Sequence, residues 1–367
     1  MSGLRPLGRE DLDEVAALYE LVMRSGTRRP PTGLASYFER TLLDHPWVDE
    51  EIPSLVHVDR DGRIVAFMSS HVRRLRLGDA PLRLACSGQL VADPEARNRA
   101  VGALLLRSYM RGPQDLTITD GATDEVRRMW TALGGEPSPL ACITWTKPFR
   151  PWRYLGDYLL DRGSRDALKP LARRLLAGPD ALTRRATGGL FRPARPATGS
   201  EPLTPEALVE HLPSLDRTLR LRPDYDLPFA GWLFGALREV YGDSLLAALV
   251  RDGRGRVLGW HVSTVRPGEV AYVLGIAATD TGAGEVVDDL FHAAHERGAV
   301  AVQGRLEPRL LEAIGRRRCL LRFTGEALIH ARDPDVLGAA LTRSALLTRL
   351  EGEWWMGHAS LPFAGTP

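Results

Sequence analysis

The sequence predicts an α+β protein built from two domains of similar element order, and three observations lead to this prediction. The chain has 367 residues, which is too long for one ordinary domain and sufficient for two that each bury a core. Short strand-like runs bounded by turn signals alternate with amphipathic helical stretches. The turn Arg60-Asp61-Gly62-Arg63 is echoed by Arg251-Asp252-Gly253-Arg254, and the predicted elements that follow each turn come in the same order. We therefore interpret the second half as an internal duplication of the first.

The composition indicates a globular protein and argues against several classes of function. Hydrophobic residues make up 44% and charged residues 26%, a balance that is typical of a folded chain rather than a disordered one. A formal net charge of +2 argues against a general nucleic-acid binder. The sequence has no apolar run of about 18 residues, as a membrane span requires, and residues 1–6 lack an apolar signal core, so we expect a cytoplasmic protein.

The cysteines and histidines favour neither a disulfide framework nor a metal site. Cys86, Cys142 and Cys319 are odd in number and have no Cys-x-x-Cys spacing. His292 and His295 lie three residues apart on a predicted helix, but no third ligand stands at a useful spacing. We therefore expect no bound metal.

The first half is predicted to follow the order β-α-α-β-β-β-α-β-α-β. Acidic residues at 10–14 suit the first turn of a helix, Asp61-Gly62 suits a hairpin turn, and Gly134-Gly135 stops a helix. The expected strands are 4–7, 55–58, 63–70, 82–92, 115–120 and 139–146, and the expected helices are 12–22, 34–42, 100–110 and 124–133. Together they predict a domain that spans residues 1–150.

Residues 151–205 have a different composition, rich in Arg, Pro and Gly, with weak helical stretches at 154–160 and 168–176. The run Arg192 to Ser200 is typical of a linker. An Arg-rich segment can bind phosphates or a membrane surface. A solvated connector is the commoner case, and we interpret residues 151–205 as a helical linker.

The second half, residues 206–360, repeats part of the first pattern. The expected strands are 245–250, 257–265, 270–277, 299–304 and 323–330, and the expected helices are 285–297 and 308–318. Asp333-Pro334-Asp335 is a typical start for a last helix. Trp354-Trp355-Met356 is predicted to close the domain as a buried strand.

The segment from Leu90 to Ala103 carries the clearest chemical signal. A strand ends, a short loop turns, and a helix begins with small residues, an arrangement that directs backbone N–H groups and the positive end of a helix at one point. Gly102 has no Cβ to hold a phosphate off the backbone, and Arg97 and Arg99 add positive charge. These features are suited to binding a pyrophosphate.

The run Arg97-Asn98-Arg99-Ala100-Val101-Gly102 resembles the acyl-CoA-binding motif of the GNAT acyltransferase superfamily, with Ala100 at a position where Gly is usual. The element order over about residues 1–150 is also similar to that superfamily. The resemblance implies two GNAT-like domains, each with a mixed, mostly antiparallel central sheet flanked by helices. It implies acetyl-CoA or another acyl-CoA as co-substrate. The cofactor-binding residues would be Leu90, Val91, Ala92, Arg97, Asn98, Arg99, Ala100, Val101, Gly102, Ala103 and Thr123.

The corresponding loop of the second half is degenerate. Residues 277–284 include Gly282 and Gly284 but neither Pro nor Arg, and Asp280 places negative charge where phosphates would lie. We therefore expect a single acyl-CoA site, in the N-terminal domain.

The resemblance implies transfer of an acyl group to an amine of a small-molecule or peptide acceptor. Two alternatives stay open: an aminoacyl-tRNA-dependent transferase of the peptidoglycan-bridge type, and a non-catalytic binding protein on the same scaffold. The position where many GNAT enzymes have a catalytic Tyr is Trp130 here, and residues 84–90 contain no carboxylate. His71 and Asp93 are the candidates for moving the amine proton, and Cys86 is a further catalytic candidate beside the acyl site.

Overall fold

The structure, a computed structural model, describes residues 3–96, 100–162, 168–186, 190–215 and 218–356. The chain forms two compact units. Unit 1 consists of residues 1–139, 219–240 and 325–367, and unit 2 of residues 140–218 and 241–324. These units divide the chain differently from the expected 1–150, 151–205 and 206–360, because each unit takes strands from both halves of the sequence.

Unit 1 is built on a sheet in the order β1-β2-β3-β4-β5-β15-β6, with β9 paired to β3. Only the β4–β5 pair is parallel. The strands are β1 (Gly3–Pro6), β2 (Leu55–Val58), β3 (Ile64–Leu77), β4 (Ala80–Ala92), β5 (Leu116–Thr119), β6 (Glu136–Pro137), β9 (Leu221–Pro223) and β15 (Leu328–Ala331).

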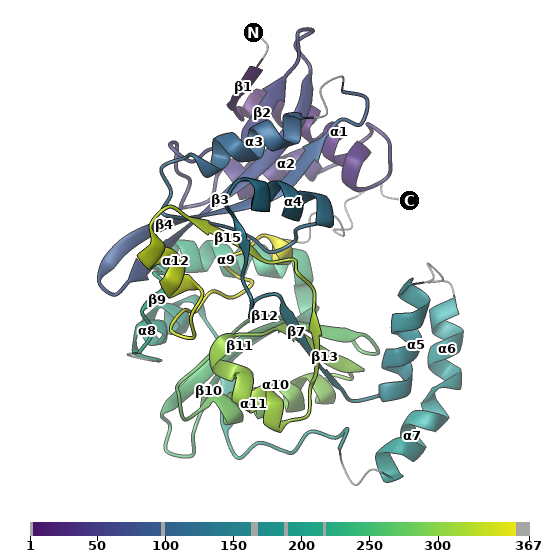
Figure 1. Ribbon diagram of the computed structural model, residues 1–367. Helices are drawn as coiled ribbons and strands as arrows, with labels where there is room; N and C mark the ends of the chain where they lie inside the picture. Colours follow the sequence, from purple (N-terminus) through teal and green to yellow (C-terminus); the bar gives the residue numbers. More distant parts are fainter. Residues whose placement is uncertain (1–2, 97–99, 163–167, 187–189, 216–217, 357–367) are drawn as a thin grey trace. The chain divides into compact units, whose positions relative to one another are not determined.

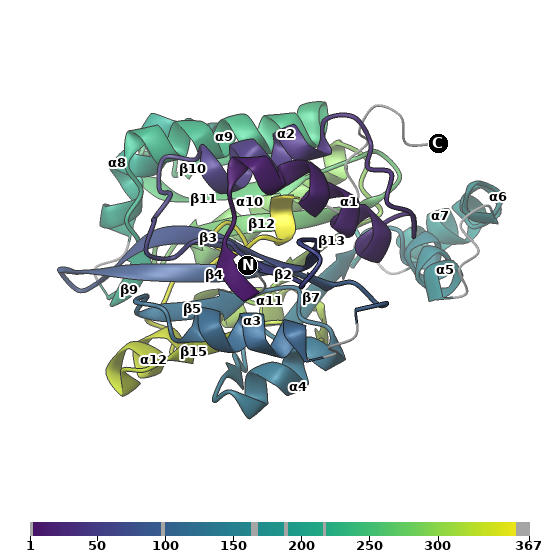
Figure 2. The same cartoon turned by 90° about the horizontal axis from the view of Figure 1, so that it is seen from above.

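Helices cover both faces of this sheet, with α1 and α2 on one side of β2–β4 and α3 and α4 on the other (Figure 2). The helices of unit 1 are α1 (Leu12–Met23), α2 (Leu34–Phe38), α3 (Val101–Met110), α4 (Asp124–Ala132), α9 (Leu227–Tyr241) and α12 (Pro334–Ala340). Residues 64–73 of β3 are buried on both faces, which explains the continuous apolar run at 64–68. Short 3-10 turns are η1 (Arg9–Asp11) and η6 (Trp354–Met356), and η2 (Glu39–Leu43) is a π-helical turn.

Unit 2 contains a second sheet in the order β14-β7-β13-β12-β11-β10-β8, in which only β12 and β13 are parallel. Its strands are β7 (Ile143–Pro148), β8 (Gly199–Pro202), β10 (Leu245–Arg251), β11 (Val257–Thr264), β12 (Val270–Ala278), β13 (Ala301–Arg305) and β14 (Leu320–Phe323). The helices are α5 (Pro151–Arg162), α6 (Lys169–Leu175), α7 (Ala177–Ala186), α8 (Pro205–Leu215), α10 (Ala283–Glu296) and α11 (Leu311–Arg316), with 3-10 turns η4 (Gly242–Ser244) and η5 (Pro308–Leu310).

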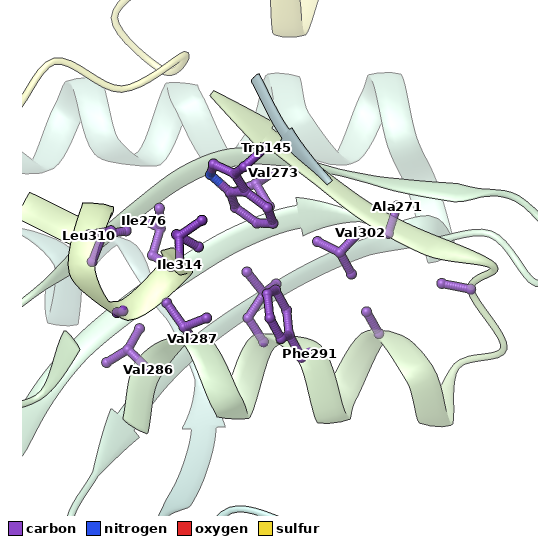
Figure 3. Close-up of a cluster of buried hydrophobic side chains, with 14 of the residues drawn as sticks. Trp145, Ala271, Val273, Ile276, Val286, Val287, Phe291, Val302, Leu310 and Ile314 are labelled. Atoms are coloured by element: carbon purple, nitrogen blue, oxygen red, sulfur yellow. The ribbon is translucent and has the colours of Figure 1, made fainter. Parts of the chain in front are cut away.

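The core of unit 2 lies between its sheet and α10 and α11. Val287 and Phe291 of α10 and Ile314 of α11 point toward Trp145 of β7 and Ile276 of β12 (Figure 3). Every one of these five side chains is buried, so the period-3.6 pattern of α10 meets the period-2 pattern of the strands in a single core. The predicted fold class, two mostly antiparallel sheets flanked by helices, is confirmed.

The two halves of the sequence exchange their last strands. Strand β7, expected to complete the first domain, pairs with β13 and β14 in the sheet of unit 2. Strand β15, from the second half, pairs with β5 and β6 in the sheet of unit 1 (Figure 1). The placement of 139–146 in the first sheet was therefore wrong, since alternation identifies a strand but not the sheet that it joins.

Two other expected elements also differ. The single strand expected at 323–330 is divided into β14 and β15, which belong to different sheets. Trp354–Met356 forms a 3-10 turn rather than a strand, with Trp355 and Met356 buried. The expected start of the last helix is confirmed, because the Asp333 side chain accepts a hydrogen bond from the Asp335 N–H.

The described residues between 151 and 186 include three helices, α5–α7, whose main contacts are with one another (Figure 1). Across the described parts of the chain, no helix combines the length and the hydropathy that crossing a bilayer demands.

Candidate functional site

Strands β4 and β5 separate partway along their length and leave one edge of β4 open. Their parallel pairing runs from Leu84–Leu116 to Cys86–Ile118 and then ends. Strand β4 continues to Ala92, where it still pairs with Ala66 of β3. Among the described residues, no strand pairs with residues 87–92 on the β5 side. Backbone groups of Leu90, Val91 and Ala92, the positions expected to bind pantetheine, lie along this open stretch.

A β-bulge interrupts β4 in the same stretch. Phe67 pairs with Val91 and Ser69 with Gly88, so two residues of β4 lie opposite one residue of β3. Gln89, inside the bulge, has a φ of 27°, which is unusual for a residue other than glycine. Bulges bend a strand and redirect its backbone groups, and they occur often beside functional sites.

Asp93 anchors the loop that follows β4. Its N–H donates to the Val65 carbonyl at 2.8 Å, and its Oδ1 accepts a hydrogen bond from the Glu95 N–H at 2.9 Å. Its Oδ2 forms an ion pair with Arg28. Both carboxylate oxygens are therefore engaged in fixing the loop, and Asp93 is a buried structural residue in this arrangement.

Helix α3 begins directly after this loop, with Ala100 as its N-cap residue. A Cβ placed on Gly102, in the first turn, would meet no atom within 4 Å. The open space beside Gly102 and the partial positive charge of the helix N-terminus suit a phosphate group. Residues 97–99, which include Arg97, Asn98 and Arg99, lie outside the described residues.

A buried polar cluster lies beside the point where β4 and β5 separate. The Cys86 thiol donates to Glu353 Oε2 at 2.9 Å. Asp120, directly after β5, accepts the N–H groups of Glu353 and Trp354 through Oδ1, each at 3.2 Å. On β3, His71 Nε2 lies 3.1 Å from Ser69 Oγ. We call Cys86, Asp120 and Glu353 the carboxyl–thiol cluster.

Burial controls the protonation of this cluster. It raises the pKa of Glu353 well above its usual range, and the negative charge of Asp120 adds to that rise. Burial also raises the pKa of the Cys86 thiol well above its usual range, and the negative charges of Glu353 and Asp120 raise it further. A thiol that keeps its proton is a weak nucleophile, so the structure favours Cys86 as a hydrogen-bond donor.

Arg73 of β3 is a buried cation that interacts electrostatically with Cys86 and Glu353. It is 1% exposed, its Nη1 donates to the Val72 carbonyl at 2.9 Å, and its guanidinium lies 5.3 Å from the centre of the Phe229 ring. Burial lowers its pKa, and the charges of Cys86, Tyr225, Glu351 and Glu353 oppose that change. Arg73 therefore offsets part of the cost of a negative charge on the carboxyl–thiol cluster.

The atoms of Cys86, Asp120 and Glu353 that could ligate a metal all lie within 4.8 Å of one another. A cation could use such a donor set, but the raised pKa values of Glu353 and Cys86 and the charge of Arg73 favour protons over a metal. We interpret the group as a proton-sharing cluster, and the absence of a metal stays a prediction.

The overall architecture has counterparts among solved structures. No family model matches the sequence, and no curated protein is detectably similar to it. A GCN5-related N-acetyltransferase from Anabaena variabilis ATCC 29413 matches with a TM-score of 0.55 and 10% identity, over 91% of this chain and 73% of that one. A protein of unknown function from Enterococcus faecalis V583, described as a probable N-acyltransferase, matches with a TM-score of 0.55 and 9% identity, over 90% and 73%. A GCN5-related N-acetyltransferase from Kribbella flavida matches with a TM-score of 0.52 and 14% identity, over 92% and 72%.

The chain has the GNAT fold. The low identities limit this conclusion to the fold, and the roles of individual residues still depend on the geometry of this chain.

The structure brings some of the sequence-predicted residues of this GNAT fold together. His71 and Cys86 lie opposite each other on β3 and β4, and both are buried. Asp93 belongs to the separate loop before α3. Thr123 caps α4, because its side chain accepts a hydrogen bond from the Val126 N–H at 3.3 Å. Trp130 is buried in the core beneath α3, and its indole cannot act as an acid there.

The sequence analysis missed Asp120, Glu353 and Arg73. Asp120 ends a predicted strand, and a polar residue at that position was a usable signal. Glu353 lies 267 residues after Cys86, and a single chain carries no signal that such distant residues meet. Arg73 was hidden because its side chain is buried inside a strand that was expected to end at residue 70.

The corresponding loop of unit 2 is closed by its own side chains. The Gly282 N–H donates to the Thr279 carbonyl and hydroxyl, each at 3.1 Å, and Arg309 pairs with Asp280. A Cβ on Gly284 would lie 3.1 Å from Nη2 of Arg317, which covers the first turn of α10. The covered turn at Gly284 differs from the open turn at Gly102 and leaves less room for a phosphate group.

Proposed function

We propose that the protein is an acyl-CoA-dependent N-acyltransferase, most simply an acetyltransferase, which acts on an amine of a small-molecule or peptide acceptor. One observation carries the proposal: the open edge of β4 runs directly to a helix N-terminus where Gly102 leaves room for a phosphate. A cytoplasmic location, as expected from the sequence, would suit an enzyme that consumes acyl-CoA.

In the proposed complex, the open edge of β4 pairs with the pantetheine arm through Leu90, Val91 and Ala92. The first turn of α3 binds the pyrophosphate through its backbone N–H groups. A backbone N–H near Val91 donates to the thioester oxygen as negative charge develops on it. The amine nitrogen attacks the carbonyl carbon, the C–N bond forms, the C–S bond breaks, and CoA leaves as a thiolate that takes up a proton.

Glu353 is the group that we assign to the amine proton. Burial and the neighbouring charge of Asp120 raise the pKa of Glu353, so its carboxyl group holds a proton more tightly than an ordinary carboxyl group does. In its ionised form, Glu353 can accept a proton from the incoming ammonium. His71 and Ser69 lie on the neighbouring strand and offer a second polar path. The raised pKa makes the Glu353 carboxylate a stronger base than an ordinary carboxylate.

Calorimetry tests the number of cofactor sites. Because the Gly102 turn is open and the Gly284 turn is covered by Arg317, we expect one equivalent of CoA per chain. Release of CoA thiol from acetyl-CoA in the presence of a panel of amines tests the activity. Two equivalents of CoA would contradict the single site, and a chain that binds no CoA would overturn the proposed function.

Asp93→Asn distinguishes the two roles considered for Asp93. Asn keeps one acceptor but loses the ion pair with Arg28, so the loop before α3 should loosen. We expect KM for acyl-CoA to rise about tenfold, the cost of one charge-assisted contact, with the shape of the pH–rate profile unchanged. Steady-state kinetics across pH measures both quantities. A changed pH profile at constant KM would show that Asp93 is a base after all.

A further inference from the structure

The three-helix segment α5–α7 exposes most of its leucines and buries the aspartates of its ion pairs. Leu159, Leu171, Leu175 and Leu182 are 59%, 58%, 70% and 67% exposed, and Trp152, Leu155 and Leu168 are also exposed. A water-facing helix group normally does the reverse. We call these seven side chains the apolar face of α5–α7.

The apolar face follows helical spacing. Trp152, Leu155 and Leu159 are three and four residues apart on α5 and therefore lie along one side of that helix. Leu171 and Leu175 are four residues apart on α6. Helices α5 and α6 thus each present an apolar stripe, and α7 adds Leu182.

Polar contacts hold the three helices together. The single Nε–H of Arg173 on α6 is shared between Oδ1 and Oδ2 of Asp157 on α5, at 3.0 and 3.1 Å. Asp180 of α7 accepts the Trp152 N–H at 2.9 Å and forms an ion pair with Arg153 of α5 at 3.4 Å. Asp157 and Asp180 are buried. Trp152 also takes part in these polar contacts, because its indole N–H donates to Thr183 Oγ1 of α7 at 2.8 Å. The leucine side chains of the apolar face have no polar group and do not contribute to them.

The charge of this segment indicates that the partner of the apolar face is negatively charged. Residues 151–195 contain ten Arg and Lys but only four Asp and Glu, although the whole chain has a formal net charge of only +2. Two of the four acidic residues, Asp157 and Asp180, are already paired with Arg173 and Arg153. Arg174 and Arg185 are exposed. The segment therefore combines exposed leucines with an excess of positive charge, within a chain whose remainder is net acidic.

We propose that α5–α7 docks on an anionic lipid bilayer, with its leucines and Trp152 in the acyl-headgroup boundary and its arginines on lipid phosphates. An interfacial helix needs an apolar side and basic flanks, and Trp is favoured at that depth. Arg binds phosphate oxygens through two parallel N–H groups. Two copies of one basic surface repel each other, so charge complementarity favours the bilayer over a second copy of this chain.

Vesicle sedimentation with the full chain tests the proposal. We expect binding to phosphatidylcholine vesicles that contain about one third phosphatidylglycerol, weak binding to phosphatidylcholine alone, and loss of binding when salt rises from about 0.1 M to about 0.5 M. Leu171→Ser/Leu175→Ser should weaken binding at least tenfold, because two exposed apolar side chains are lost. Each of Arg174→Gln and Arg185→Gln should weaken it about fivefold.

A matched control is Leu311→Ser on α11, since Leu311 is exposed in unit 2 but lies outside the apolar face. This variant should bind vesicles like the unmodified chain. Quenching of Trp fluorescence by brominated lipids, lost in Trp152→Phe, would place the bilayer against α5 even if a leucine variant were poorly folded. Sedimentation equilibrium measures whether a second copy of this chain, rather than a bilayer, covers the apolar face. The proposal is overturned if anionic vesicles do not bind, if the leucine variants bind unchanged, or if those variants instead dissociate a dimer.

Discussion

Replacing Glu353 by Gln is expected to lower kcat/KM at least about a hundredfold, the ordinary cost of losing a general base. Gln keeps the shape of the side chain and can still accept the Cys86 thiol hydrogen bond, but it cannot take a proton from an ammonium. In the unmodified chain, the rate should rise as the pH passes the raised pKa of Glu353. In the variant, that rise should disappear.

Although Glu353→Gln should lower the rate, it should not lower the free energy of unfolding near pH 8. Because burial raises the pKa of Glu353, the folded chain keeps this proton to a higher pH than the unfolded chain does. The folded state then binds more protons, so the free energy of unfolding falls as pH rises from about 4.3 toward the raised pKa. Glu353→Gln removes that fall. Thermal melts between about pH 5 and pH 8 should therefore show a variant at least as stable as the unmodified chain at the upper end.

Glu351→Gln is the matched control, since Glu351 is also buried and lies two residues away. Its Oε2 accepts the Thr348 N–H and hydroxyl at 2.6 and 2.9 Å, and its Oε1 accepts the Tyr225 hydroxyl. We expect this variant to be less stable but to keep the shape of the pH–rate profile. If Glu353→Gln retained both the rate and its pH dependence, Glu353 would not be the base.

Local sequence signals predicted most elements but not their pairing. The turn at Asp61-Gly62 and the cap at Asp333 depend on residues within four positions of each other, and both occur in the structure. The sheet that a strand joins depends on distant partners. Strands β7 and β15 have ordinary strand patterns, and nothing within either pattern states that they exchange sheets.

The candidate site also has a part that local sequence signals predicted and a part that depends on distant residues. The open β4 edge and the turn at Gly102 are local, because strand, loop and helix follow one another over residues 80–110. The carboxyl–thiol cluster is not local, since Cys86 and Asp120 meet a carboxyl group contributed by the last described turn of the chain. Sequence signals close to β4 predicted His71 and Asp93 as bases, whereas the carboxyl group with the raised pKa belongs to Glu353.

Replacing Gly102 by Glu is expected to raise the Kd for CoA at least about a hundredfold, a change of about 2.7 kcal/mol. The new carboxylate would stand in the first turn of α3, at the position that we assign to the pyrophosphate, and would repel it at close range. The space beside Gly102 is open, so the side chain itself fits without a clash. Calorimetric titration with CoA measures the change.

The variant should remain folded, which makes the loss of binding interpretable. Glu has a higher helix propensity than Gly, and a negative charge near a helix N-terminus is favourable by about 0.3–1 kcal/mol. Gly102→Ala separates bulk from charge and should weaken binding by a smaller factor. Gly315→Glu on α11 makes the same chemical change at another helical glycine with open space around it and should leave CoA affinity unaltered. Normal CoA binding by Gly102→Glu would mean that α3 does not hold the pyrophosphate, because a phosphate and a carboxylate cannot share that turn at unchanged affinity.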